Sequence, residues 1–185
     1  MLIYNMTKLK IIIEIPSIQQ FKRYCRHYEE YNYDTIIFSD SFNRKLKNRI
    51  PHVIKSVIFG SRFNQAVDNL PNSIIHLTFG YDFNQSVNNL PSSIQYIYFG
   101  TCFDQSVDFL PSSIIYLTFG WRFNQHVDNL PNSIIDLTFG YCFNQSIDNL
   151  PESVKFVYLS DNYHTTIHKL PRNIKKLYIG NTSIV

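Results

Sequence analysis

The sequence predicts a mostly β solenoid, built from 20-residue coils that stack a parallel sheet along one face. Proline recurs every 20 residues, and glycine follows each proline by nine residues in six of seven units, with Ser160 as the replacement. A fixed period in this range is typical of repeat architectures, in which each unit covers the apolar face of its neighbour. Phe (15) and Tyr (13) are abundant, which favours strands over helices. The repeated prolines are Pro51, Pro71, Pro91, Pro111, Pro131, Pro151 and Pro171.

The first 32 residues do not follow this period. Apolar residues alternate from Leu9 to Ile15, a pattern that predicts a strand, and Pro16 ends it. Ser17 is suited to N-cap a helix that runs to about Tyr31. We therefore expect residues 1–32 to form a strand–helix cap with a right-handed crossover, and residues 33–185 to form one continuous solenoid.

Each position within the repeat has a predicted structural role, most clearly in residues 71–90. Ile74, Leu77 and Phe79 are expected to point inward from the strand, and Phe83 from the return segment. Gly80 is expected either where a side chain would crowd the turn or where φ must be positive. The register already begins at Phe38, which precedes Phe59 by 21 residues, so about nine strands at ~4.8 Å spacing predict a rod roughly 40 Å long.

Polar residues also recur at the same phase, and their roles are predicted to be structural. Stacked amides can satisfy the backbone groups that a tight coil leaves unpaired. A serine after each proline is expected to form the turn, because none has a histidine in phase to act as a base. The amide columns are Asn64, Asn84, Asp104, Asn124 and Asn144 with Gln65, Gln85, Gln105, Gln125 and Gln145, and the serines are Ser73, Ser93, Ser113, Ser133 and Ser153.

Charge and cysteine content restrict the possible classes of protein. The net charge is +6 over residues 1–62, −6 over residues 63–150 and +3 over residues 151–185. An acidic centre would repel a nucleic-acid backbone lying along the solenoid, so nucleic acid is not the expected partner. Cys102 and Cys142 lie two repeats apart, roughly 9–10 Å, which is too far for a disulfide. With no signal peptide or membrane-spanning run recognisable, we expect a monomeric intracellular protein.

The sequence contains no motif of a catalytic or metal site. His164 and His168 are four residues apart, but this spacing suits a metal on a helix, and the segment is predicted to be turn and strand. No phosphate loop, dinucleotide fingerprint or nucleophile elbow occurs. We expect no enzyme activity and no cofactor.

Variation between repeats is concentrated on the outer face of the strands and just after the glycines. These positions are rich in tyrosine and include the single tryptophan, Trp121, beside Arg122. Tyr, Trp and Arg are the residue types enriched at interface anchors, although strands favour aromatic residues in any case. The candidate protein-binding face comprises His76, Tyr81, Tyr96, Tyr98, Tyr116, Trp121, Arg122, Tyr141, Phe156 and Tyr158.

The repeated unit, Leu-Pro-x-Ser-Ile-x-x-Leu-x-Phe-Gly-x-x-Phe-Asn-Gln-x-Val, resembles the FNIP repeat. That repeat is a relative of leucine-rich repeats and is known from social amoebae and giant amoebal viruses. The resemblance covers residues 51–180, with a degenerate unit at 33–50, and it implies a leucine-rich-repeat-like solenoid. Leu159-Ser160 and Ile179-Gly180 depart from the Phe-Gly of the pattern.

The resemblance also implies a role in binding. Family members often carry an F-box before the repeats, which implies a substrate receptor of a ubiquitin ligase. Residues 1–32 are predicted to supply only one strand and one helix, so no F-box is recognisable. We expect a non-enzymatic scaffold that binds a protein partner on the strand face. The alternatives are a ubiquitin-ligase adaptor acting through the N-terminal strand–helix and, from another class, a carbohydrate-binding module that stacks sugars on the aromatic face.

Overall fold

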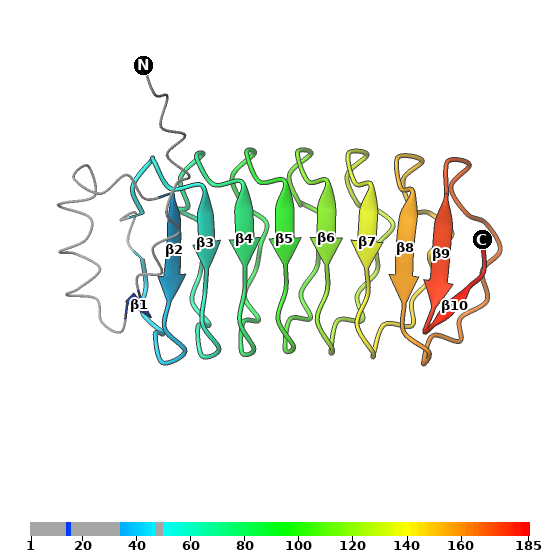
Figure 1. The fold of residues 1–185 in the computed structure, drawn as a ribbon, viewed down its shortest axis with the longest axis horizontal. Coiled ribbons are helices and arrows are strands. Elements are labelled where there is room, and N and C mark those ends of the chain that lie inside the picture. The colour runs from blue at the N-terminus through cyan, green and yellow to red at the C-terminus, as the bar shows by residue number, and fades with distance from the viewer. Residues whose placement is uncertain (1–13, 16–33, 47–49) are drawn as a thin grey trace, which may run out of the picture.

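The computed structural model describes residues 14–15, 34–46 and 50–185, and they form one ten-stranded sheet in which sequence order is spatial order. Figure 1 shows the strands side by side along the long axis, each returning through a loop behind the sheet. The strands are β1 (Glu14–Ile15), β2 (Thr35–Phe38), β3 (Ser56–Ile58), β4 (His76–Thr78), β5 (Tyr96–Tyr98), β6 (Tyr116–Thr118), β7 (Asp136–Thr138), β8 (Phe156–Leu159), β9 (Lys176–Ile179) and β10 (Thr182–Ser183).

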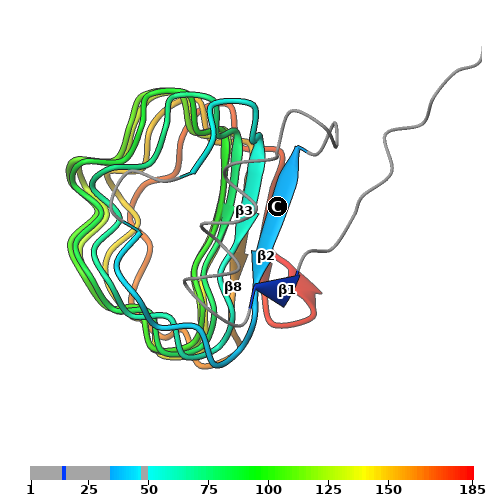
Figure 2. The ribbon, with the colours of Figure 1, turned by 90° about the vertical axis from the view of Figure 1, so that its left-hand side faces the viewer.

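The register of the sheet follows the sequence period. From β3 to β9 every paired residue lies 20 positions from its partner, as in Leu77 with Ile97, and all of these pairs are parallel. The β2–β3 pair has an offset of 21, as in Ile36 with Val57, so the extra residue before Pro51 is accommodated outside the strands. Seen along the axis, the coils superimpose closely (Figure 2). The predicted parallel solenoid and its nine parallel strands are confirmed, and the short β10 pairs antiparallel with β9.

The core consists of the inward columns that the sequence predicts. Ile74, Leu77, Phe79 and Phe83 are each at most 1% exposed, as are most of their equivalents in the other coils. Within one coil the rings of Phe79 and Phe83 stack at 3.7 Å, and Phe79 stacks on Phe99 of the next coil at 5.5 Å. Such contacts repeat from Phe38 to Tyr163 and make one continuous aromatic core.

Crowding explains the repeated glycines. A Cβ on Gly80, Gly100, Gly120 or Gly140 would overlap the carbonyl oxygen of the glycine one coil earlier. Among the glycines described, only Gly180 has a positive φ, at 58°. Of the two predicted reasons, close approach of neighbouring coils therefore applies inside the solenoid, and conformational freedom applies at its last turn.

The asparagine column forms a hydrogen-bonded ladder, as predicted. Asn64 Oδ1 accepts the backbone N–H of Asn84 at 3.0 Å and the side-chain Nε2 of Gln85 at 2.9 Å. The same pair of bonds recurs at each coil from Asn43 to Asn124. Asp104 takes part through one carboxylate oxygen, which replaces the amide carbonyl without loss of either bond. Each coil therefore satisfies a backbone donor of the next.

The serines after the prolines lie in turns, as predicted, and three of them also link coils. The hydroxyls of Ser93, Ser113 and Ser133 donate to a carbonyl of the preceding coil at 2.5–2.6 Å. A second ladder lies on the return segment, where Asn89, Asn129 and Asn149 each donate to an aspartate one coil earlier at 3.1–3.2 Å. These polar contacts hold neighbouring coils in register outside the apolar core.

The last coils preserve these roles with different residues. Tyr163 takes the place of the ladder phenylalanine, and its hydroxyl donates to the Gln145 carbonyl at 3.2 Å. Thr165 takes the glutamine position and donates to Asn144 Oδ1 at 2.8 Å. At the other end, Glu14–Ile15 pairs with β2 as the predicted first strand requires. The predicted helix over residues 17–31 falls outside the described residues, so the cap remains a prediction.

Candidate binding face

The outward side chains of β4 to β9 form a continuous surface, here called the strand face. Each three-residue strand core alternates out, in, out, so residues 76 and 78 face outward around the buried Leu77. The following coils repeat this arrangement at intervals of 20 residues. Two parallel rows of variable side chains result, one beginning at His76 and the other at Thr78.

The first row begins with a stack of three rings. His76 lies 4.3 Å from Tyr96, and Tyr96 lies 4.9 Å from Tyr116, with interplanar angles of 18° and 6°. One face of the Tyr116 ring is therefore covered by Tyr96, and the opposite face is turned toward β7. Tyr116 is 42% exposed, and Tyr98 in the second row is 51% exposed.

At β7 the aromatic row is interrupted by a carboxylate. Asp136 pairs in register with Tyr116 on one side and Phe156 on the other, and Thr138 follows it in the second row. Burial by these neighbours raises the pKa of the Asp136 carboxyl above its usual 3.8. Within the described part of the chain, the carboxylate of Asp136 has no hydrogen-bond donor and no cationic partner. It is a partly desolvated charge without compensation.

Aromatic residues resume on the far side of Asp136. Tyr158 stacks on Tyr178 at 5.1 Å and 3°, which leaves the other face of Tyr158 toward Thr138. Desolvation, the negative charge of Asp136 and the neighbouring Tyr178 together raise the pKa of Tyr158. Asp136 is therefore close enough to Tyr158 for its charge to be felt there.

A second group of candidate residues follows the glycines and is here called the turn rim: Tyr81, Trp121, Arg122 and Tyr141. Trp121 and Tyr141 stack at 4.4 Å and 15°. Tyr81 is two coils from Trp121, with Thr101 in the coil between, and no ring contact joins them. Arg122 is exposed and, in the described residues, has no acidic partner. Of the rim, the structure brings together only Trp121 and Tyr141 as a stacked pair.

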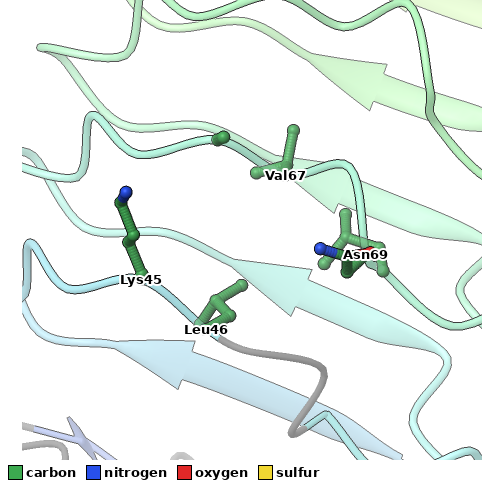
Figure 3. Close-up of a pocket in the computed structure, with 6 residues that line it drawn as sticks. Lys45, Leu46, Val67 and Asn69 are labelled. Atoms are coloured by element: carbon green, nitrogen blue, oxygen red, sulfur yellow. The ribbon is translucent and has the colours of Figure 1, made fainter.

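The hollows of the surface are shallow and lie away from the centre of this face. One of about 240 Å³ lies between two return segments, lined by Lys45 and Leu46 from one coil and Val67 and Asn69 from the next (Figure 3). Another, of about 460 Å³, lies on the strand face between Asp34 and Thr78. Neither contains a nucleophile with a base, so neither provides a catalytic arrangement.

Other chemistry is little supported by the described residues. Residues 14–15, 34–46 and 50–185 contain no cluster of three metal-ligating side chains. His164 lies in the ladder instead, where its Nε2 is 2.6 Å from Asn144 Nδ2. Cys102 and Cys142 are free thiols, as their spacing predicts. None of the described segments forms a helix long and apolar enough to cross a bilayer.

Sequence reasoning missed two residues that the geometry places in the strand face. Tyr178 was outside the candidate set, although it stacks on Tyr158. Asp136 was outside it because an isolated aspartate on a strand is usually a solvated residue. The available signal was its phase, since Asp136 occupies the position of Tyr96 and Tyr116 in its own repeat.

Comparison with known proteins agrees with this geometry. The FNIP Repeat family matches residues 63–102, 103–142, 123–162 and 143–182, which together span 63–182. The chain belongs to the FNIP-repeat family. No curated protein matches it.

The FNIP repeats also resemble a solved structure. The crystal structure of CroV588, from the giant virus CroV and described as a novel circular LRR protein structure, is 38% identical with a TM-score of 0.74. The match covers 80% of this chain and 24% of CroV588, so this chain spans about a quarter of that protein. The leucine-rich-repeat-like fold is thus shown, in an FNIP-repeat solenoid of the scaffold type.

Proposed function

We propose that this FNIP-repeat solenoid is a non-enzymatic scaffold that binds a protein partner on the strand face. The observation that supports it best is the row of stacked, solvent-accessible rings formed by His76, Tyr96 and Tyr116. Stacking holds these rings in place before any partner arrives, so little side-chain entropy remains to be lost on binding. Large, rigid aromatic surfaces of this kind are typical of interface anchors.

The turn rim extends this surface along the same side of the coils. Trp121 and Tyr141 are 54% and 41% exposed, although they stack on one another. A patch of aromatic residues from several coils is larger than the scattered apolar exposure expected of an ordinary surface. The binding surface therefore comprises the strand face together with the Trp121–Tyr141 pair.

The test is capture of partners by the full chain from a lysate of the cell in which it is made. The double variant Tyr116→Ala/Trp121→Ala should lose the partner. The matched control is Phe109→Ala, which removes an aromatic side chain 68% exposed on the return segment and should keep it. Partners that bind both variants equally would contradict the proposal. Ubiquitin-ligase subunits that remain bound to the double variant, or a positive glycan array with no protein partner, would favour the two alternatives instead.

A further inference from the structure

We propose that the strand face contains a slot for an arginine side chain of the partner, with Asp136 at its floor and the aromatic side chains of β6 and β8 as its walls. This inference rests on the proposed function and names the chemistry of the partner at that face. Figure 1 shows β7 lying directly between β6 and β8. The slot is defined by Tyr116, Asp136, Thr138, Phe156 and Tyr158.

The geometry of the walls follows from the ring stacks. Tyr116 is covered on one face by Tyr96, so its free face is toward the Asp136 position. Tyr158 is covered by Tyr178, so its free face is toward Thr138. The two aromatic walls are two strand spacings apart, about 9.6 Å, so a group midway would be about 4.8 Å from each wall. That distance is within the roughly 6 Å over which a cation interacts with a ring face.

The floor of the slot requires a cation. Asp136 is partly desolvated, which raises the pKa of its carboxyl, and no described residue neutralises it. A bound cation would compensate this charge in a surrounding of low polarity, where the interaction is stronger than in water. The wider field has the same sign, because residues 63–150 carry a net charge of −6. A basic segment of a partner would therefore be attracted to the centre of the solenoid.

Arginine fits this slot better than lysine for geometric reasons. A guanidinium is planar, stacks on aromatic faces and presents a fork of N–H donors that matches a carboxylate. The slot offers an aromatic wall on each side and a carboxylate at its floor. A lysine ammonium is a strongly hydrated point charge and would use the carboxylate but gain less from parallel walls.

The test uses the full chain and three acetylated, amidated pentapeptides that differ only in a central arginine, citrulline or lysine between glycines. Two-dimensional amide NMR follows the titrations. The arginine peptide should shift amides of β6, β7 and β8, and the neutral isostere citrulline should bind about tenfold more weakly, because it lacks the charge-assisted bonds. Asp136→Asn should abolish the preference for arginine over citrulline. Asp128→Asn, the same charge change on the return segment, should leave it intact.

Each result bears on the slot independently of the wider function. Equal binding of arginine and citrulline, or an unchanged preference in Asp136→Asn, would overturn the slot. Lysine binding as tightly as arginine would overturn the assignment to a planar guanidinium. In the capture experiment, a partner lost with Tyr116→Ala/Trp121→Ala but retained with Asp136→Asn refutes the slot and supports the proposed function. A partner that ignores all of these variants refutes the proposed function, while the peptide titration still decides the slot.

Discussion

Asn124→Ala is the change that tests most directly how neighbouring coils are held together. Asn124 Oδ1 accepts the backbone N–H of Asn144 at 2.9 Å and Nε2 of Gln145 at 3.2 Å. Alanine leaves both donors without an acceptor. The Gln145 side chain can rotate toward water, but the Asn144 N–H is fixed in the half-buried coil. An orphaned buried donor costs about 1–3 kcal/mol, which we expect as the loss in unfolding free energy.

Urea denaturation measures this loss globally, and hydrogen exchange measures it at the site. The Asn144 amide should exchange roughly 5- to 150-fold faster in Asn124→Ala, the equivalent of about 1–3 kcal/mol. Asn132→Ala is the matched control, because Asn132 is exposed in a turn and has no hydrogen-bond partner among the described residues. It should change the unfolding free energy by less than about 0.5 kcal/mol.

A second substitution in the same column separates the acceptor from its charge. Asp104 Oδ1 accepts the equivalent two bonds at 2.9 and 3.0 Å. Asp104→Asn should therefore fold with nearly unchanged stability, because an amide carbonyl can accept both. If Asn124→Ala unfolds at the urea concentration of the wild type, or if Asp104→Asn loses as much as Asn124→Ala, the ladder does not stabilise the solenoid in this way.

Three further predictions concern other features of the solenoid. Gly100→Ala should destabilise the protein more than Gly180→Ala, because it forces a Cβ against the Gly80 carbonyl, whereas Gly180 requires only a left-handed φ, worth about 1–2 kcal/mol; urea midpoints compare them. Folding raises the pKa of Asp136 above 3.8, so ionisation opposes folding as pH rises through that value, and Asp136→Asn should be more stable than wild type near neutral pH but not in acid below 3.8; equal differences at both pH values would contradict this. Burial raises the pKa of Tyr163 to about 12, so the tyrosinate absorbance missing from Tyr163→Phe should be confined to the alkaline end of a titration, and its loss near pH 10 would contradict the buried position.

The coil could be predicted almost residue by residue because its physical requirements repeat. An inward position such as Leu77 and a crowded position such as Gly100 are constrained identically in every coil, so the constraint appears as a column in the sequence. The asparagine ladder was predictable for the same reason, since a tight coil leaves the same backbone donor unpaired at each turn. The register shift of 21 before Pro51 was visible as an offset between Phe38 and Phe59, which stack at 5.2 Å.

The strand face was less predictable because it depends on ring orientation and not only on residue type. The spacing of Tyr96 and Tyr116 predicts that they are neighbours, but not that they stack at 6° with one ring face left open. The turn rim shows the converse, since Tyr81 shares the phase of Trp121 but lies two coils away. Whether these residues bind a partner stays a prediction until the variants are measured.

The pattern of substitutions separates scaffold columns from the strand face on physical grounds. Where a scaffold column changes, the replacement retains the original interaction: Asp104 accepts the same two bonds as asparagine, and Thr165 still donates to the ladder. Where the strand face changes, the chemistry changes with it, because Tyr116 is followed in the same row by Asp136 and then Phe156. Burial of the Asp136 charge opposes folding, and no described residue offsets it. A position that disfavours the fold without compensation inside the fold is best explained by a compensating group outside it, which is the basis for assigning the slot to a cationic side chain of a partner.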